Sequence, residues 1–130
     1  MNGPYLHLKD FPNEGATLEE QVSDRFRIFV FRDGRAELTF EDPDGNMVKK
    51  QMEPGLGYRI HKGQKYSIHA DNVSRIMEAT VPEPWVGEIH RNHFYAEEYV
   101  HRIGKPWGHE LHFGKEDDPV MAKILHINVG

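Results

Sequence analysis

The chain has 130 residues, no cysteine and a formal net charge of −5 at pH 7, which fits one domain and excludes disulfides and thiolate metal sites. Its lysines and arginines are scattered, and this argues against a nucleic-acid partner because a phosphate-backbone footprint needs clustered cations. No apolar run reaches membrane length and no signal or transit peptide is visible, so we expect a cytoplasmic protein with no membrane partner.

Short β-strands separated by turn signals are expected along the first two thirds of the chain. The β-rich stretch 24–31 is the strongest of them, and the turn signal Asp33-Gly34 predicts that residues 35–41 return as its hairpin partner. The polar residues 15–23 are expected to form a connection with at most weak helical character. Further strands are expected at 6–8, 47–52, 58–61, 66–70 and 73–81. Many short strands at regular intervals are typical of an all-β barrel or sandwich.

The β pattern resumes near the C-terminus after a break. Residues 83–104 are expected to form a connector, with one helical turn as an option at 95–100. Two more strands are expected at 105–114 and 120–129. Unpaired strand edges promote association. We therefore expect these two strands to join the barrel's own sheet or the sheet of a partner subunit, giving a homodimer.

The segment 53–70 contains glycine turns between two short strands. Its spacing resembles the second motif of the cupin superfamily. That motif is a glycine, five residues, a proline, one residue, a glycine, two residues, a metal-binding histidine, three residues and an asparagine. Gly55 and Gly63 match its glycines, whereas His61 stands at the proline position and Tyr66 at the position of the histidine.

The first cupin motif is also matched only at its glycines. It consists of a glycine, five residues, His-x-His, three or four residues, a glutamate, six residues and a glycine. Gly15 and Gly34 fit the glycines, and Arg27 stands at the glutamate. The histidine positions hold Gln21 and Ser23, or Glu20 and Val22 in the register with the longer spacing. The resemblance implies a cupin-type jelly-roll β-barrel over residues 1–82 in which every metal-binding position is changed.

The tail carries a second resemblance. Lys105-Pro106-Trp107-Gly108, followed by residues 120–130, is similar to the opening of the type II mannose-6-phosphate isomerases, with Lys105 in place of an arginine. The segment 74–83 also resembles the stretch that leaves the first barrel of two-barrel cupins. These resemblances imply that 105–130 is the opening of a second cupin unit, forming a two-strand extension, and that the chain is the first half of a bicupin.

Arg27 is the most informative of the candidate pocket residues. If it points into a barrel, its guanidinium must be paired or must bind an anion. Glu20 or Glu78 would make a structural ion pair, which is the favoured interpretation because buried charges usually pair within the protein. A phosphate or carboxylate ligand is the alternative. Tyr66 is either a hydroxyl donor to a ligand or, as packing favours, a core aromatic residue.

Four other residues complete the candidate set. Phe29 shares a strand face with Arg27 by the period of two, and Tyr58 opens a strand of the segment 53–70. The imidazoles of His61 and His69 can bind zinc, manganese or iron, but neither residue has the spacing of a motif ligand. No metal site is therefore expected. If a metal does bind, His61 and His69 are the alternative ligands. A connector group is interpreted as a solvated face; its members are Glu88, His90, His93, Glu97 and Glu98.

Two functions stay open on this basis. The favoured one is a non-catalytic module of a bicupin without a cofactor, which binds a small molecule such as a sugar or sugar phosphate or serves assembly. The alternative is an enzyme, a metal-dependent sugar-phosphate isomerase of the mannose-6-phosphate type. The relatives that this second resemblance implies use a divalent metal to polarise a carbonyl and to shuttle a proton.

Overall fold

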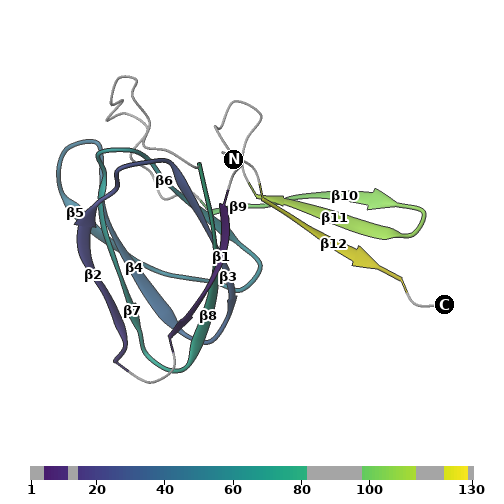
Figure 1. Ribbon diagram of the computed structural model, residues 1–130, viewed down its shortest axis with the longest axis horizontal. Helices are drawn as coiled ribbons and strands as arrows, with labels where there is room; N and C mark the ends of the chain where they lie inside the picture. Colours follow the sequence, from purple (N-terminus) through teal and green to yellow (C-terminus); the bar gives the residue numbers. More distant parts are fainter. Residues whose placement is uncertain (1–4, 12–14, 82–97, 114–121, 129–130) are drawn as a thin grey trace.

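The computed structural model describes residues 5–11, 15–81, 98–113 and 122–128. Their regular structure consists of β-strands without a helix, which confirms the all-β class. The same ranges accordingly contain no helix with the length and apolarity of a membrane span. The strands fall into a barrel of two facing sheets and a third sheet that extends from it (Figure 1).

Two antiparallel sheets build the barrel. The strands of the first sheet are β1 (Tyr5–Phe11), β3 (Arg27–Asp33), β6 (Gly57–Ile60), β8 (Ser74–Thr80) and β9 (Glu98–Tyr99). Their order is β1-β8-β3-β6-β9. The strands of the second sheet are β2 (Thr17–Val22), β4 (Ala36–Glu41), β5 (Met47–Gln51) and β7 (Lys65–Ala70), in the order β2-β7-β4-β5.

Two predictions for this half of the chain are wrong. Residues 15–23 contain strand β2, which pairs with β7, instead of a weakly helical connection. The hairpin of 24–31 with 35–41 does not form, because β3 pairs with β6 and β8 while β4 pairs with β5 and β7. Between β3 and β4 the chain crosses from one sheet to the other at Gly34, whose φ is +103°.

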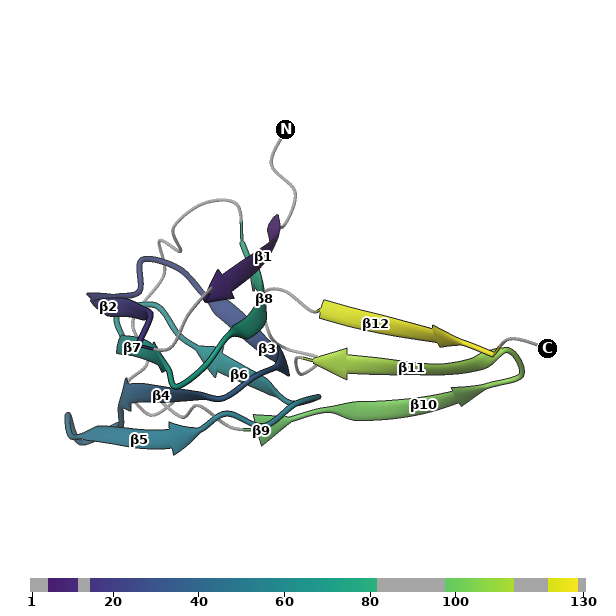
Figure 2. The same ribbon diagram turned by 90° about the horizontal axis from the view of Figure 1, so that it is seen from below.

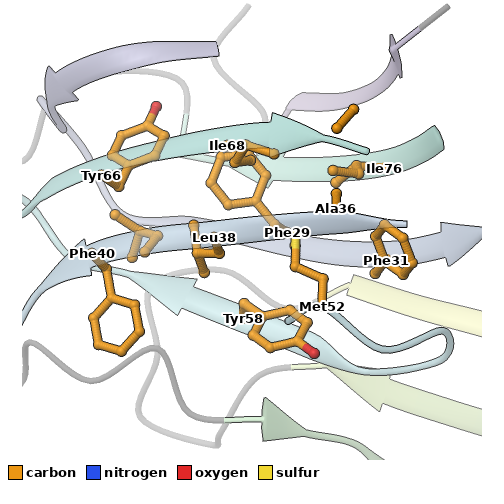
Figure 3. Packing of buried hydrophobic residues seen from close by; sticks show 12 residues of the cluster. Phe29, Phe31, Ala36, Leu38, Phe40, Met52, Tyr58, Tyr66, Ile68 and Ile76 are labelled. Atoms are coloured by element: carbon orange, nitrogen blue, oxygen red, sulfur yellow. The ribbon is translucent and has the colours of Figure 1, made fainter. Parts of the chain in front are cut away.

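Apolar side chains from both sheets fill the barrel interior (Figure 3). The largest of them are fully buried, and the rings of Phe29 and Tyr66 approach with their centroids 5.6 Å apart. The cluster consists of Phe29, Phe31, Ala36, Leu38, Phe40, Met52, Tyr58, Ile60, Tyr66, Ile68, Ala70 and Ile76. Facing alternate residues of two sheets interdigitate in this way in any β-sandwich core.

The C-terminal residues form the third sheet, which we call the arm. It contains β10 (His101–Lys105), β11 (Gly108–Phe113) and β12 (Ala122–Ile127), in the order β10-β11-β12. Figure 2 shows it extending from the barrel. β11 and β12 lie within the two expected strands, whereas β10 lies mostly in the expected connector. Among the described residues, the arm strands pair with no strand of the barrel sheets, which was one of the two expectations. The short strand β9, just before the arm, pairs with β6.

A second apolar cluster holds the arm against the barrel. Ile28 and Val30 of β3 point away from the interior and pack with Phe113 of β11 and Ala122 of β12, together with Phe26 and Ala79. Both faces of β3 are therefore buried, which explains its nearly continuous apolar sequence. The strand assignment at Glu98 and Tyr99 excludes a helical turn at those two residues, and residues 95–97 lie outside the described ranges.

Phe113 should contribute most of this attachment, because its side chain is fully buried between the arm and the barrel. We expect Phe113→Ala to lower the free energy of unfolding by about 3 kcal/mol, as large-to-small changes in cores do. Trp107→Ala is the matched control, since Trp107 is an aromatic residue of the same arm with 38% exposure, and it should cost less than about 1 kcal/mol. Urea denaturation measures both, and equal losses would contradict the second core.

Candidate functional site

Residues at the four motif positions that carry metal ligands in the cupin pattern meet at one end of the barrel. Gln21 of β2 lies opposite Tyr66 of β7 in the strand register. Arg27 of β3 donates from Nε to Ser23 Oγ at 3.0 Å. Of the two registers considered for the first motif, the one with Gln21 and Ser23 therefore fits this arrangement.

Arg27 is the centre of an ion-paired cluster. Its Nη1 donates to Glu78 Oε2 and its Nη2 to Asp24 Oδ1, both at 2.9 Å. The side chain of Arg27 is 17% exposed and that of Glu78 only 4%. All three guanidinium nitrogens thus donate to groups of the protein itself, as a largely buried cation requires. The structure contains the structural ion pair of the favoured interpretation, with Glu78 and not Glu20 as the acid.

Asp24 closes the outer side of this cluster. It also accepts two hydrogen bonds at 3.1 Å from the guanidinium of Arg25. These bonds, with a smaller contribution from Arg27, hold the pKa of Asp24 below its ordinary value of 3.8. The stabilisation that this carboxylate supplies is therefore complete above pH 3.8 and is lost as the pH falls through its lowered pKa. Half of the Asp24 side chain is exposed, so the effect is small.

Tyr66 lies beside the cluster as a buried aromatic residue. Burial raises the pKa of its hydroxyl above the ordinary value, and the Arg27 cation only partly offsets this. The hydroxyl therefore stays protonated at neutral pH. Its ring packs on Phe29 inside the barrel, so the position that holds a metal-binding histidine in the cupin motif here belongs to the core.

The other pocket candidates lie apart from the cluster or inside the packed interior. Glu20 is exposed on β2 and does not join Arg27, so its assignment to the pocket is corrected. Phe29 and Tyr58 are fully buried. The Tyr58 hydroxyl accepts a hydrogen bond from the backbone N–H of Glu53 at 2.7 Å. Both aromatic residues thus serve the core, and the structure unites only Arg27, Tyr66 and Glu78 with their neighbours.

His61 and His69 are associated with opposite ends of β7. The His61 backbone N–H donates to Gln64, just before β7, and its ring packs on Phe26. His69 is exposed near the end of β7, with Nδ1 2.9 Å from Thr17 Oγ1. Within the ranges that the structure describes, no three His, Cys, Asp or Glu side chains gather as a metal would require. Four members of the connector group, Glu88, His90, His93 and Glu97, lie outside those ranges, and the fifth, Glu98, belongs to strand β9.

Two residues that the sequence interpretation missed support this end of the barrel. Gln64 is fully buried and donates from Nε2 to the Glu41 backbone oxygen at 2.8 Å. Its own backbone oxygen accepts from the N–H of Ser23, which positions the partner of Arg27. The period of two that runs from Gln64 through Tyr66 and Ile68 was the signal for its inward position. Asp24, the other missed residue, carried a charge three positions before Arg27.

The side chains at the motif positions do not fit the divalent metal that the cupin pattern implies. The guanidinium of Arg27 is a permanent cation with donors only. Gln21 and Ser23 offer a neutral amide and a neutral hydroxyl, and the Tyr66 phenol stays protonated. Zinc, manganese and iron sites use imidazole, carboxylate or thiolate ligands, and a fixed positive charge among them would repel the ion.

No model of a known protein family matches this sequence, and no curated protein matches it. Solved structures do. A cupin-superfamily protein of Desulfitobacterium hafniense aligns over 62% of this chain and 69% of its own, with 16% identity and a TM-score of 0.54. The cupin domain of Drosophila melanogaster CENP-C aligns over 58% of this chain and 59% of its own, with 18% identity and a TM-score of 0.52.

A variant of Bacillus subtilis oxalate decarboxylase has a TM-score of 0.57 and 15% identity over 65% of this chain. The match spans only 22% of the decarboxylase chain. Identities this low carry no information on activity, since one fold hosts many functions. The comparisons therefore show that this chain has the jelly-roll fold of cupin-superfamily proteins.

Proposed function

We propose that this chain is a non-catalytic cupin module with a structural role in assembly. The observation that carries the proposal is the use of Arg27: a side chain at a ligand position of the motif donates to Ser23, Asp24 and Glu78 within 3.0 Å. With Arg25, which pairs with Asp24, the cluster contains two cations and two carboxylates, and it ties β3 to β8 and to the connection between β2 and β3. It does for the barrel what a bound metal does in a metallated site, which is to tie several strands together.

Packing favours assembly over the binding of a sugar-sized ligand. The interior side chains Phe29, Leu38 and Tyr58 are all at 0% exposure. A ligand of that size needs a cavity of about 300 Å³ or more. A ligand inside the barrel would have to displace these interior apolar side chains.

The arm supports the bicupin part of the proposal. It is a sheet of three strands whose outer strands β10 and β12 each pair only with β11 among the described residues, so that a further strand could pair with either edge. Its sequence Pro106-Trp107-Gly108 is similar to the opening of a second cupin unit, and the two lines of argument together favour that identity for residues 105–130. The mannose-6-phosphate type of isomerase is the alternative, and among the described residues only this tail favours it.

Metal analysis of the purified chain tests the proposal. After incubation with Zn²⁺, Mn²⁺ or Fe²⁺ and desalting, we expect well below one ion per chain. The comparison variant restores motif ligands through Gln21→His, Ser23→His, Arg27→Glu and Tyr66→His, with Glu78→Gln to remove the extra charge. That variant should retain about one zinc ion. One bound ion in the unmodified chain, together with turnover of a hexose phosphate, would establish the isomerase alternative.

A further inference from the structure

The two edges of the arm differ in chemistry. The β10 edge carries His101, Arg102 and Lys105, and charged side chains on an edge discourage pairing with another strand. The β12 edge also carries one cation, Lys123, but its other outer-face residues are Leu125 and Ile127, which are 55% and 64% exposed. β12 contains no proline, and within the described ranges β11 is its only strand partner. An exposed apolar edge of this kind is a template for a further strand.

The orientation of the unpaired backbone groups on β12 follows from one hydrogen bond. The N–H of Asn128 donates to the Trp107 backbone oxygen at 2.7 Å, toward the β11 side. Because backbone groups alternate along a strand, the odd-numbered residues direct their N–H and C=O groups to the opposite side. These residues are Lys123, Leu125 and Ile127. They present three donors and three acceptors to whatever lies beside β12.

We propose that β12 is a dimerisation strand, which pairs antiparallel with the β12 strand of a second copy of this chain. The inference rests on the proposed assembly role and names its partner: a second copy of the chain supplies the strand that a second cupin unit would otherwise place beside β12. A second copy fits because the edge is complementary to itself in one register. With Leu125 on the twofold axis, Lys123 lies opposite Ile127 in both directions. All six outward backbone groups of each strand then find a partner, and the two arms become one sheet.

Side-chain chemistry agrees with this register on the outer face of the arm. The two Lys123 cations are kept apart, since each faces an apolar Ile127. Leu125 and Ile127 of both copies become cross-strand neighbours and lose solvent contact, which is the main source of stabilisation between strands. Glu110 of β11 lies opposite Leu125. It is already paired with His112 at 2.8 Å, so it brings no unpaired charge to the interface.

The barrel-facing side of the arm is also compatible. His126 stacks on His109 with ring centroids 4.7 Å apart. In the proposed register, His126 lies opposite Ile124 of the second copy. Desolvation and then the neighbouring Arg102 and His126 lower the pKa of His109, so its imidazole is neutral at pH 7. The neutral His109 ring and its stacked neighbour lie beside an isoleucine in this register.

The mass of the purified chain in solution is the first test. Light scattering after size exclusion should give twice the 15.1 kDa of one chain at about 50 μM. Leu125→Lys places two cations opposite each other on the axis and should raise the dissociation constant at least tenfold, by about 1.4 kcal/mol or more. Val48→Lys is the matched control, because it changes an exposed apolar residue on the edge strand β5. It should leave the dimer unchanged.

A cross-link tests the register itself. The chain has no cysteine, so Leu125→Cys introduces a single thiol. Directly paired residues of antiparallel strands have Cα atoms about 5.5 Å apart, within the range of a disulfide. Mild oxidation should therefore yield a covalent dimer, whereas Val73→Cys, at an equally exposed position, should not. A monomer at all concentrations, or a dimer that ignores Leu125→Lys and does not cross-link, overturns the inference. Neither result bears on metal content, which tests the barrel alone.

Discussion

Replacing Arg27 with methionine is expected to lower the free energy of unfolding by about 3 kcal/mol. The substitution keeps most of the apolar volume but removes the cation beside Glu78, whose side chain is only 4% exposed. A buried carboxylate that loses its charged partner keeps its desolvation penalty without the compensating attraction. Urea denaturation monitored by circular dichroism at pH 7 measures the loss.

Two further variants separate the ion pair from a general effect of arginine removal. Arg25→Met removes a cation whose partner Asp24 is half exposed, and it should cost less than about 1 kcal/mol. In the double variant Arg27→Met with Glu78→Met, both charges are gone and much of the stability should return. If the double variant is as unstable as the sum of its single changes, the pair does not couple and Arg27 acts by packing alone.

Gly34→Ala is the second change with a large expected effect, about 2 to 5 kcal/mol. Gly34 has φ +103°, which costs an L-residue about 1–2 kcal/mol. A Cβ there would also collide with the Val73 backbone oxygen and lie 2.6 Å from Ser74 Cα. Backbone atoms cannot yield as a side chain can. The crossing from β3 to β4 would therefore have to move, and overpacking of this kind costs about 1–3 kcal/mol more.

Gly55→Ala provides the control for the dihedral angle alone. Gly55 has φ +83°, and a Cβ there meets nothing within 4 Å. Its cost should stay near 1 kcal/mol, which is the strain of the left-handed conformation without a collision. Thermal denaturation of the two variants side by side is the measurement. Similar melting temperatures would mean that the contact with Val73 and Ser74 relaxes easily.

Most strands could be located from the sequence because their alternation reflects burial on one face. The expected strands at 35–41, 47–52, 58–61, 66–70 and 73–81 overlap β4 to β8 closely. β2 and β10 were missed because they lack such a buried face. In β2 only Leu18 is half-buried, and β10 is exposed at four of its five residues, so neither shows an apolar face. A strand that is held by backbone pairing alone leaves little trace in its side chains.

The partner of each strand was harder to derive than the strand itself. Asp33-Gly34 between two apolar runs is a hairpin signal, yet here the chain uses it to change sheets. A local signal reports the bend and not the direction in which the chain leaves it. The run 28–31 did contain a usable clue, because both its odd and its even positions are apolar. That pattern requires a cover on each face, and the second cover is the arm.

The candidate site was predictable in its logic but not in its members. A cation at Arg27 had to be paired if it was buried, and the sequence offered two acids, Glu20 and Glu78. The choice depends on which strand lies beside β3. That strand is β8, in which Glu78 lies directly opposite Phe29. Sequence spacing says nothing about such neighbours, whereas inward positions such as Tyr66 follow from the period of two.

Strand β3 contributes side chains to two separate hydrophobic clusters. Its odd-numbered residues Phe29 and Phe31 belong to the barrel interior, and its even-numbered residues Ile28 and Val30 belong to the seam with the arm. The four residues 28–31 thus make two independent sets of contacts, one from each face of the strand. Substitutions at the even-numbered positions can therefore change or abolish the attachment of the arm while the packing of the barrel interior stays the same.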